Sequence, residues 1–131
     1  MTIACLAPNG MNVYRGSGVA TRLLVGTAKG VAVLERAPGE DWRHAGTLLE
    51  GQHISSMVME PVNGGIFAGV HRGTVFFSPD RGKSWEPRNA GISISHVYSL
   101  VYAVENGKPI IYAGTEPPNV FRSRDDGKTL L

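Results

Sequence analysis

The sequence predicts an all-β fold made of a recurring antiparallel sheet, and three observations lead to this prediction. Short apolar runs rich in β-branched and aromatic residues alternate with turns of Gly, Asn, Asp and Pro. Three glycines, Gly26, Gly69 and Gly114, recur at intervals of 43 and 45 residues, and each stands nine residues before a polar turn. No segment keeps a helical period. A fixed period of this length is typical of repeat architectures.

The middle repeat defines the unit. Turn residues divide it into four expected strands, Ile54–Glu60, Ile66–Val70, Thr74–Ser78 and Trp85–Asn89, designated a to d. Four strands in roughly 40 to 45 residues form one blade of a β-propeller. We therefore expect a single partial β-propeller domain, 1–131, of four-stranded antiparallel blades at about 1–50, 51–94 and 95–131.

The outer repeats follow the same plan less completely. In the third, we expect strands at Val97–Val104, Ile110–Thr115 and Asn119–Arg122, and the blade lacks its outer strand because the sequence stops at Leu131. In the first, we expect Ile3–Ala7, a loop over Asn9–Gly18, and then Thr21–Gly26 and Val31–Leu34. Cys5 is expected to be a small buried strand residue, and Trp42 and Trp85 to be core residues.

Three blades do not close a ring, since closed propellers use typically 4 to 8. An incomplete ring leaves an apolar sheet face uncovered at each end. Three interpretations remain open: the chain is a fragment of a longer propeller, it closes by self-association, or its end faces bind another protein chain.

Composition limits the partners. The net charge of +2 comes from interleaved acids and bases, so no basic stripe for nucleic acid forms. A single cysteine excludes an internal disulfide. The opening residues lack the basic start of a signal peptide, and no apolar run approaches a membrane span. We therefore expect a cytoplasmic protein with no nucleic-acid or membrane partner.

The turn of the middle repeat carries a recognisable pattern. Residues 78–85 read Ser-Pro-Asp-Arg-Gly-Lys-Ser-Trp, of the form Ser-x-Asp-x-Gly-x-x-Trp. This octet resembles the Asp-box, or bacterial neuraminidase repeat, of sialidases, xyloglucanase-type glycosidases, sortilin and photosystem II assembly factor propellers. Residues 123–130 repeat it with Leu130 in place of the Trp, and residues 35–42 keep only its Gly and Trp.

The resemblance implies that the boxes lie on the c–d hairpins, opposite the binding face. We expect Asp80 and Asp125 to accept turn N–H groups rather than to act as catalytic acids. We do not expect a calcium loop, because only Lys128, Thr129 and two leucines follow Gly127 and the alternating oxygen ligands are not found there. The expected structural box residues are Ser78, Asp80, Gly82, Trp85, Ser123, Asp125, Gly127, Gly39 and Trp42.

The opposite face is the expected binding face, because in an antiparallel blade the b–c and d–a loops share one end. The candidate ligand-binding residues there are Lys29, Glu50, His53, His71, Arg72, His96 and Glu116, with Gln52 and Pro117 beside them. His53 and His96 occupy equivalent repeat positions before the innermost strand and would lie near the central channel of a closed ring. Imidazoles suit zinc or copper, but residues at equivalent repeat positions more often bond a loop carbonyl, so we expect no metal and no cofactor.

Glycoside hydrolysis normally needs two carboxyl groups beside the bond, and only Glu50 and Glu116 fall on this face. The arginine motif of sialidases is also missing. The sequence thus predicts a non-catalytic binding or assembly module, whose partner is a second copy, another protein or a carbohydrate. The alternative is a fragment of a sialidase-like or xyloglucanase-like hydrolase with its catalytic groups in other blades.

Overall fold

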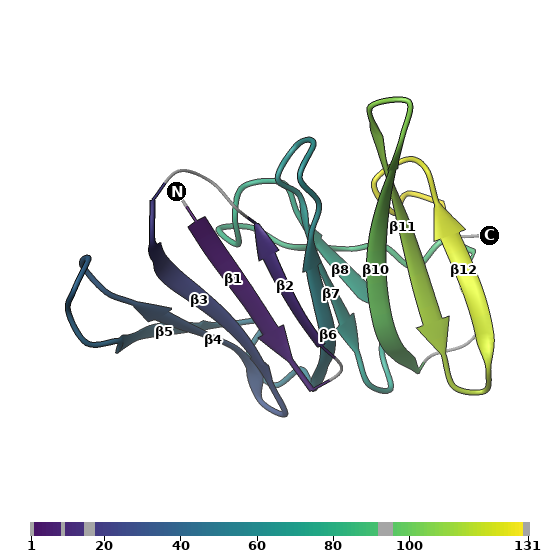
Figure 1. Ribbon diagram of the computed structural model, residues 1–131. Coiled ribbons are helices and arrows are strands. Elements are labelled where there is room, and N and C mark those ends of the chain that lie inside the picture. The colour runs from purple at the N-terminus through teal and green to yellow at the C-terminus, as the bar shows by residue number, and fades with distance from the viewer. Residues whose placement is uncertain (1, 9, 15–17, 92–95, 130–131) are drawn as a thin grey trace.

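The chain forms three β-sheets that lie side by side (Figure 1). The computed structural model describes residues 2–8, 10–14, 18–91 and 96–129. The first sheet has the order β2-β1-β3-β4-β5, the second β6-β7-β8-β9 and the third β10-β11-β12. Their bounds are β1 Thr2–Ala7, β2 Gly10–Tyr14, β3 Ala20–Thr27, β4 Gly30–Glu35, β5 Arg43–Leu48, β6 Ile54–Met59, β7 Ile66–Val70, β8 Val75–Ser78, β9 Glu86–Pro87, β10 Val97–Glu105, β11 Lys108–Thr115 and β12 Asn119–Ser123.

The all-β prediction is confirmed, since the described residues contain strands and no helix. Accordingly, no described helix is long and apolar enough to cross a membrane. The second sheet has the four antiparallel strands that were expected. Its last strand, predicted over Trp85–Asn89, covers only β9. Pro87 has no N–H to donate to a ladder, although the N–H of Arg88 still bonds the Val75 carbonyl (2.6 Å).

The first sheet departs from the predicted pattern of four antiparallel strands. The expected loop over Asn9–Gly18 contains strand β2, which pairs antiparallel with β1; Asn9 and residues 15–17 lie outside the described residues. β3 then pairs with the other edge of β1, and the two strands run parallel. The reason is geometric: β2 reverses the chain once, so β3 enters the sheet in the direction of β1.

The second sheet is buried on both faces. One hydrophobic cluster joins it to the first sheet through residues such as Leu24, Ile54 and Met57, and another joins it to the third sheet through Phe67 and Val97. All residues of β6 and β7 are buried. This explains why these strands read as continuous apolar runs rather than as an alternation of apolar and polar residues.

Cys5 and Trp42 were both predicted to be core residues, but only Cys5 is buried. Cys5 is buried, and this desolvation raises the pKa of its thiol to about 12. Trp42 is only half-buried and belongs to neither cluster; the guanidinium of Arg36 lies over its ring, 4.3 Å from the centroid. The first sheet has no described neighbour on that side, so the ring packs against a cation instead.

The repeat glycines mark close contacts between consecutive sheets. A Cβ added to Gly26 would lie 2.7 Å from Ile54 Cγ2, and one added to Gly69 would lie 2.8 Å from Val97 Cγ1. Ile54 and Val97 each begin the first strand of the next sheet. A glycine is therefore required wherever the next sheet inserts a β-branched side chain.

Two buried serines of β6 add hydrogen bonds between the second and third sheets. The Ser55 hydroxyl lies within bonding distance of the Val97 and Gly69 carbonyls. The Leu100 N–H donates to Ser56 Oγ (3.0 Å). These bonds fix the register of β10 against β6.

We expect Gly69→Ala to lower the free energy of unfolding by about 1–3 kcal/mol, because its methyl group overpacks against Val97. Gly46→Ala is the matched control: Gly46 lies in β5, without positive φ, and an added Cβ meets nothing within 4 Å. Urea denaturation measures both variants. Equal stabilities would contradict the inferred close contact.

Candidate binding site at the loop face

Strand alternation places the connecting segments at two opposite ends of the sheets. Segments 28–29, 49–53, 71–74, 96 and 116–118 share one end, which we call the loop face. The β6–β7 and β8–β9 turns, at 60–65 and 79–85, lie at the opposite end, which we call the turn end. The candidate ligand-binding residues were assigned to the loop face.

Three of these candidates form a row on the loop face. His53 precedes β6, His71 follows β7 and His96 precedes β10. The ring centroid of His71 lies 5.1 Å from that of His53 and 5.2 Å from that of His96. We call these three residues the histidine row. It brings together three loops from the second and third sheets.

A recurring backbone bond holds this row in place. The His71 N–H donates to the His53 carbonyl (2.8 Å), and the Glu116 N–H donates in the same way to the His96 carbonyl (3.0 Å). In both cases, the residue after a sheet's second strand bonds the residue before its first strand. The repeat itself therefore sets the spacing of His53 and His71, whereas the distance from His71 to His96 spans two sheets.

The other candidates are arranged less closely. Arg72 is exposed, has φ of 59° and lies near enough to His71 to influence its charge. Lys29 and Glu50 are exposed beside the first sheet, where the Gly51 N–H bonds the Lys29 carbonyl (3.0 Å). Glu116 is exposed beside His96.

Tyr98 joins the row and was missed from the sequence. Its ring centroid lies 5.5 Å from that of His71, and it is 40% exposed. The sequence carried no clear signal for it, because Tyr98 reads as an ordinary residue of β10 and lies where the pairing of β10 with β11 shifts register. It adds a large aromatic surface and a hydroxyl to the row.

The electrostatics of the row favour neutral imidazole at its centre. Desolvation, together with the positive charges of the two flanking histidines and Arg72, lowers the pKa of His71. Within the described ranges, no three His, Cys, Asp or Glu side chains are arranged to hold a metal ion. The row therefore offers imidazole and guanidinium donors and an aromatic surface to a ligand.

The turn over residues 79–85, whose sequence resembles the Asp-box, is a compact hydrogen-bonded unit at the turn end. The buried Ser78 hydroxyl accepts the Gly82 N–H (2.7 Å) and donates to Asp80 Oδ1 (2.9 Å). The Ser84 N–H donates to the same oxygen (2.9 Å), and the Trp85 indole N–H donates to the Gly82 carbonyl (3.0 Å). Gly82 has φ of 93°, so the turn requires a residue that tolerates this conformation.

The second copy repeats these contacts. The Gly127 N–H donates to Ser123 Oγ (2.7 Å), which donates to Asp125 Oδ1 (2.8 Å). The Thr129 N–H and hydroxyl both bond the Asp125 carboxylate. These are the contacts that the turn-stabilising role requires. In the degenerate copy, Gly39 keeps its positive φ of 80°.

The same bonds determine the acidity of the box carboxylates. Hydrogen bonds from the Ser84 hydroxyl and backbone lower the pKa of Asp80 to about 2. Bonds from Thr129 likewise hold the pKa of Asp125 below its ordinary value. A general acid needs a proton near neutral pH, so neither carboxyl suits that role.

Several other acidic side chains have structural partners away from the loop face. Glu60 is fully buried and accepts the N–H groups of Val62, Asn63 and Gly65 (2.7, 3.0 and 3.0 Å). Its role as a turn acceptor was not foreseen. Among the described residues, Glu35, Glu86 and Glu105 form ion pairs with arginines.

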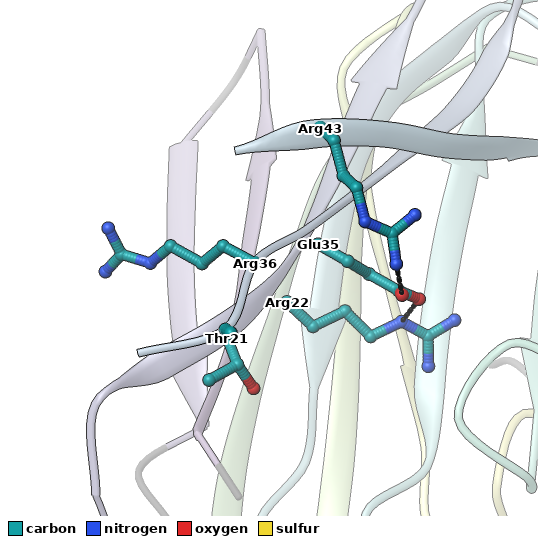
Figure 2. A pocket seen from close by; sticks show the side chains of 6 residues that line it. Thr21, Arg22, Glu35, Arg36 and Arg43 are labelled. Carbon is teal, nitrogen blue, oxygen red and sulfur yellow. Dashed lines mark hydrogen bonds and ion pairs between the residues drawn. The ribbon is translucent and has the colours of Figure 1, made fainter. Parts of the chain in front are cut away.

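A cavity of about 400 Å³ lies beside β3, β4 and β5 (Figure 2). Arg22 and Arg43 converge on Glu35, at 4.0 and 3.4 Å, whereas Arg36 points away from it. Arg22 also donates to the carbonyl of Arg81, in the box turn of the second sheet (3.2 Å). This cluster ties the first two sheets together and is explained by that structural role.

Comparison with known proteins identifies the architecture. No protein-family model matches the chain, and no curated protein matches it. Among solved structures, YCF48 bound to a D1 peptide superposes with a TM-score of 0.59 at 14% identity, over 98% of this chain and 38% of that one. A GH74 enzyme of Niastella koreensis gives 0.56 at 20%, over 98% and 22%.

Both similar structures are β-propellers. This chain folds as part of a β-propeller. It spans well under half the length of either similar protein. At these identities the likeness concerns the fold, and the partial-propeller prediction is confirmed at that level.

We expect Ser78→Ala to lower the free energy of unfolding by about 1–3 kcal/mol, because the Gly82 N–H is left buried without its acceptor. Ser84→Ala removes an exposed hydroxyl from the same turn but keeps its backbone bond to Asp80. We expect a loss less than half as large for this control. Urea denaturation compares the two, and equal losses would argue against a central role for Ser78.

We expect stability to fall as pH is lowered from 7.5 to 5. The pKa of His71 is lower in the folded chain than in the unfolded one, so below about 6.5 the unfolded chain binds the proton first. His71→Gln should weaken this pH dependence, and His44→Gln, on β5, should leave it unchanged. Urea denaturation at both pH values measures it; parallel curves for His71→Gln and the parent chain would refute the assignment.

Proposed function

We propose that this chain is a non-catalytic propeller module of Asp-box type that serves binding or assembly. Its loop face holds a protein or carbohydrate partner, and its open end faces contact another chain. The observation that carries the proposal is the histidine row. Three imidazoles from three separate loops meet beside Tyr98 and Arg72 on one face. Loops on a rigid sheet scaffold are where proteins commonly place binding residues.

The arrangement of the carboxylates supports binding rather than hydrolysis. Asp80 and Asp125 are held in turns at the other end, and Glu60 is enclosed by backbone donors. On the loop face, Glu50 precedes the second sheet and Glu116 belongs to the third. A glycosidase needs two carboxyl groups placed on either side of one bond.

A protein partner is favoured over a carbohydrate. The similar structure of YCF48 holds a peptide, which is an example of a propeller that binds a protein segment. The guanidinium of Arg72 and the histidine row supply donors for backbone carbonyls and carboxylates. Tyr98 supplies an aromatic surface for an apolar side chain.

A second candidate function is glycoside hydrolysis, with this chain as a fragment of a sialidase-like or xyloglucanase-like enzyme. The likeness to a GH74 enzyme and the Asp-box pattern favour it. This candidate places the catalytic groups in other blades. Release of sugar from xyloglucan or a fluorogenic sialoside by a longer chain that contains this sequence, but not by this sequence alone, would support it against the first.

The test of the proposed function is selection of ligands from a phage-displayed random peptide library with the immobilised chain. We expect selected peptides to bind His71→Ala and Arg72→Asn variants at least about tenfold more weakly, a loss of roughly 1.4 kcal/mol. Asn is chosen because it tolerates the positive φ of Arg72. Arg43→Ala, at an exposed arginine on β5, is the control. Peptides that bind all variants equally would contradict a site at the row.

A further inference from the structure

The outward face of the third sheet carries a socket. This depression of about 550 Å³ is lined by Tyr98, Ser99, Gly114, Thr115, Pro118, Asn119 and Val120. Apolar side chains around it are open to solvent: Val120 is 66% exposed and Val101 is 57% exposed. Ser99 and Gly114 pair with each other on β10 and β11, at its centre.

The second sheet has the same socket, and there it is filled. Gly69 stands at the position of Gly114, and Ser56 at the position of Ser99. Val97 of the third sheet enters the space over Gly69, where a Cβ would lie 2.8 Å from its Cγ1. Three residues later, the Leu100 N–H donates to Ser56 Oγ. The filled socket therefore takes a β-branched side chain and a backbone donor from one incoming strand.

The first sheet shows the same contact, in which a β-branched side chain of the next sheet fills the space over a strand glycine. Ile54 of the second sheet fills the space over Gly26, where a Cβ would lie 2.7 Å from its Cγ2. The chain thus makes the same contact twice, each time with the first strand of the next sheet. Over Gly114, an added Cβ meets only Ser99 of its own sheet, at 2.6 Å to Oγ.

The first sheet has the complementary open side. Leu24 faces the second sheet, so its neighbours Leu23 and Val25 lie on the outward side of β3, where they are half-buried. The glycines of the box turns also indicate that the outward side of the first sheet is open. A Cβ added to Gly82 would lie 3.1 Å from Leu48 Cδ1 of the preceding sheet, whereas one added to Gly39 would meet nothing within 4 Å.

We propose that a second copy of this chain occupies the socket, with the first sheet of one copy packed on the third sheet of the other. One kind of contact then covers both open faces, which a partner bound at one face does not achieve. When this contact forms twice about a twofold axis, two copies close a ring of six sheets, which is within the range of closed propellers. This inference rests on the assembly part of the proposed function and is independent of ligand binding at the histidine row.

The experiment is sedimentation equilibrium of the full chain over a wide range of concentration. We expect a species of twice the 14.0 kDa chain mass and none larger. Ser99→Ala/Gly114→Val fills the socket and removes the hydroxyl that would clash with the new side chain. It should weaken dimerisation at least tenfold. Gly46→Val, at a strand glycine with open space around it on the side facing the second sheet, is the matched control and should leave dimerisation unchanged.

Complementation distinguishes this head-to-tail contact from other dimers. Leu23→Arg disrupts the packing surface of the first sheet and keeps the socket intact. Val120→Asp, at an already exposed side chain, disrupts only the socket face. Each variant should sediment as a monomer, and their mixture should form a heterodimer through its one intact contact. A monomeric parent, higher oligomers, or a mixture that stays monomeric would overturn the proposal. A His71→Ala variant that still dimerises but loses peptide binding separates this result from that of the ligand test.

Discussion

The close contact between a strand glycine and a β-branched side chain of the next sheet governs how this molecule is built. Gly26 against Ile54 and Gly69 against Val97 bring the backbones of consecutive sheets closer than any larger residue permits. Because the sheets meet there, the hydroxyls of Ser55 and Ser56 reach the next strand and fix its register. The two hydrophobic clusters lie on either side of the second sheet as a consequence.

The box turns stabilise the opposite end by a different kind of interaction. Their serine, aspartate and glycine bond one another within a few residues, so the unit depends little on the neighbouring sheets. Its glycines nevertheless contribute to packing, since Gly82 lies against Leu48 and Gly127 against Arg88. The carboxylates of Asp80 and Asp125 are thereby committed to hydrogen bonds within their own turns.

Local patterns predicted the parts of the fold that local chemistry determines. The strands of the middle repeat were placed well because turn residues bound them and both their faces are buried. The parallel pair of β1 and β3 was not foreseen, because pairing between separated strands leaves no mark in a residue pattern. For the site, the repeat placed the three histidines on one face, but the 5.2 Å between the rings of His71 and His96 depends on the contact between sheets. Tyr98 was missed because it reads as an ordinary strand residue.

The histidine row and the packing of the sheets are linked through adjacent residues of the chain. His53 directly precedes Ile54, and His96 directly precedes Val97, so each outer ring of the row is attached to a side chain that fills a glycine space. His71 lies between them because its N–H bonds the His53 carbonyl. A shift of the third sheet against the second therefore moves the ring of His96 relative to that of His71. It follows that the geometry offered to a ligand on the loop face is set by the same contact that holds the sheets together.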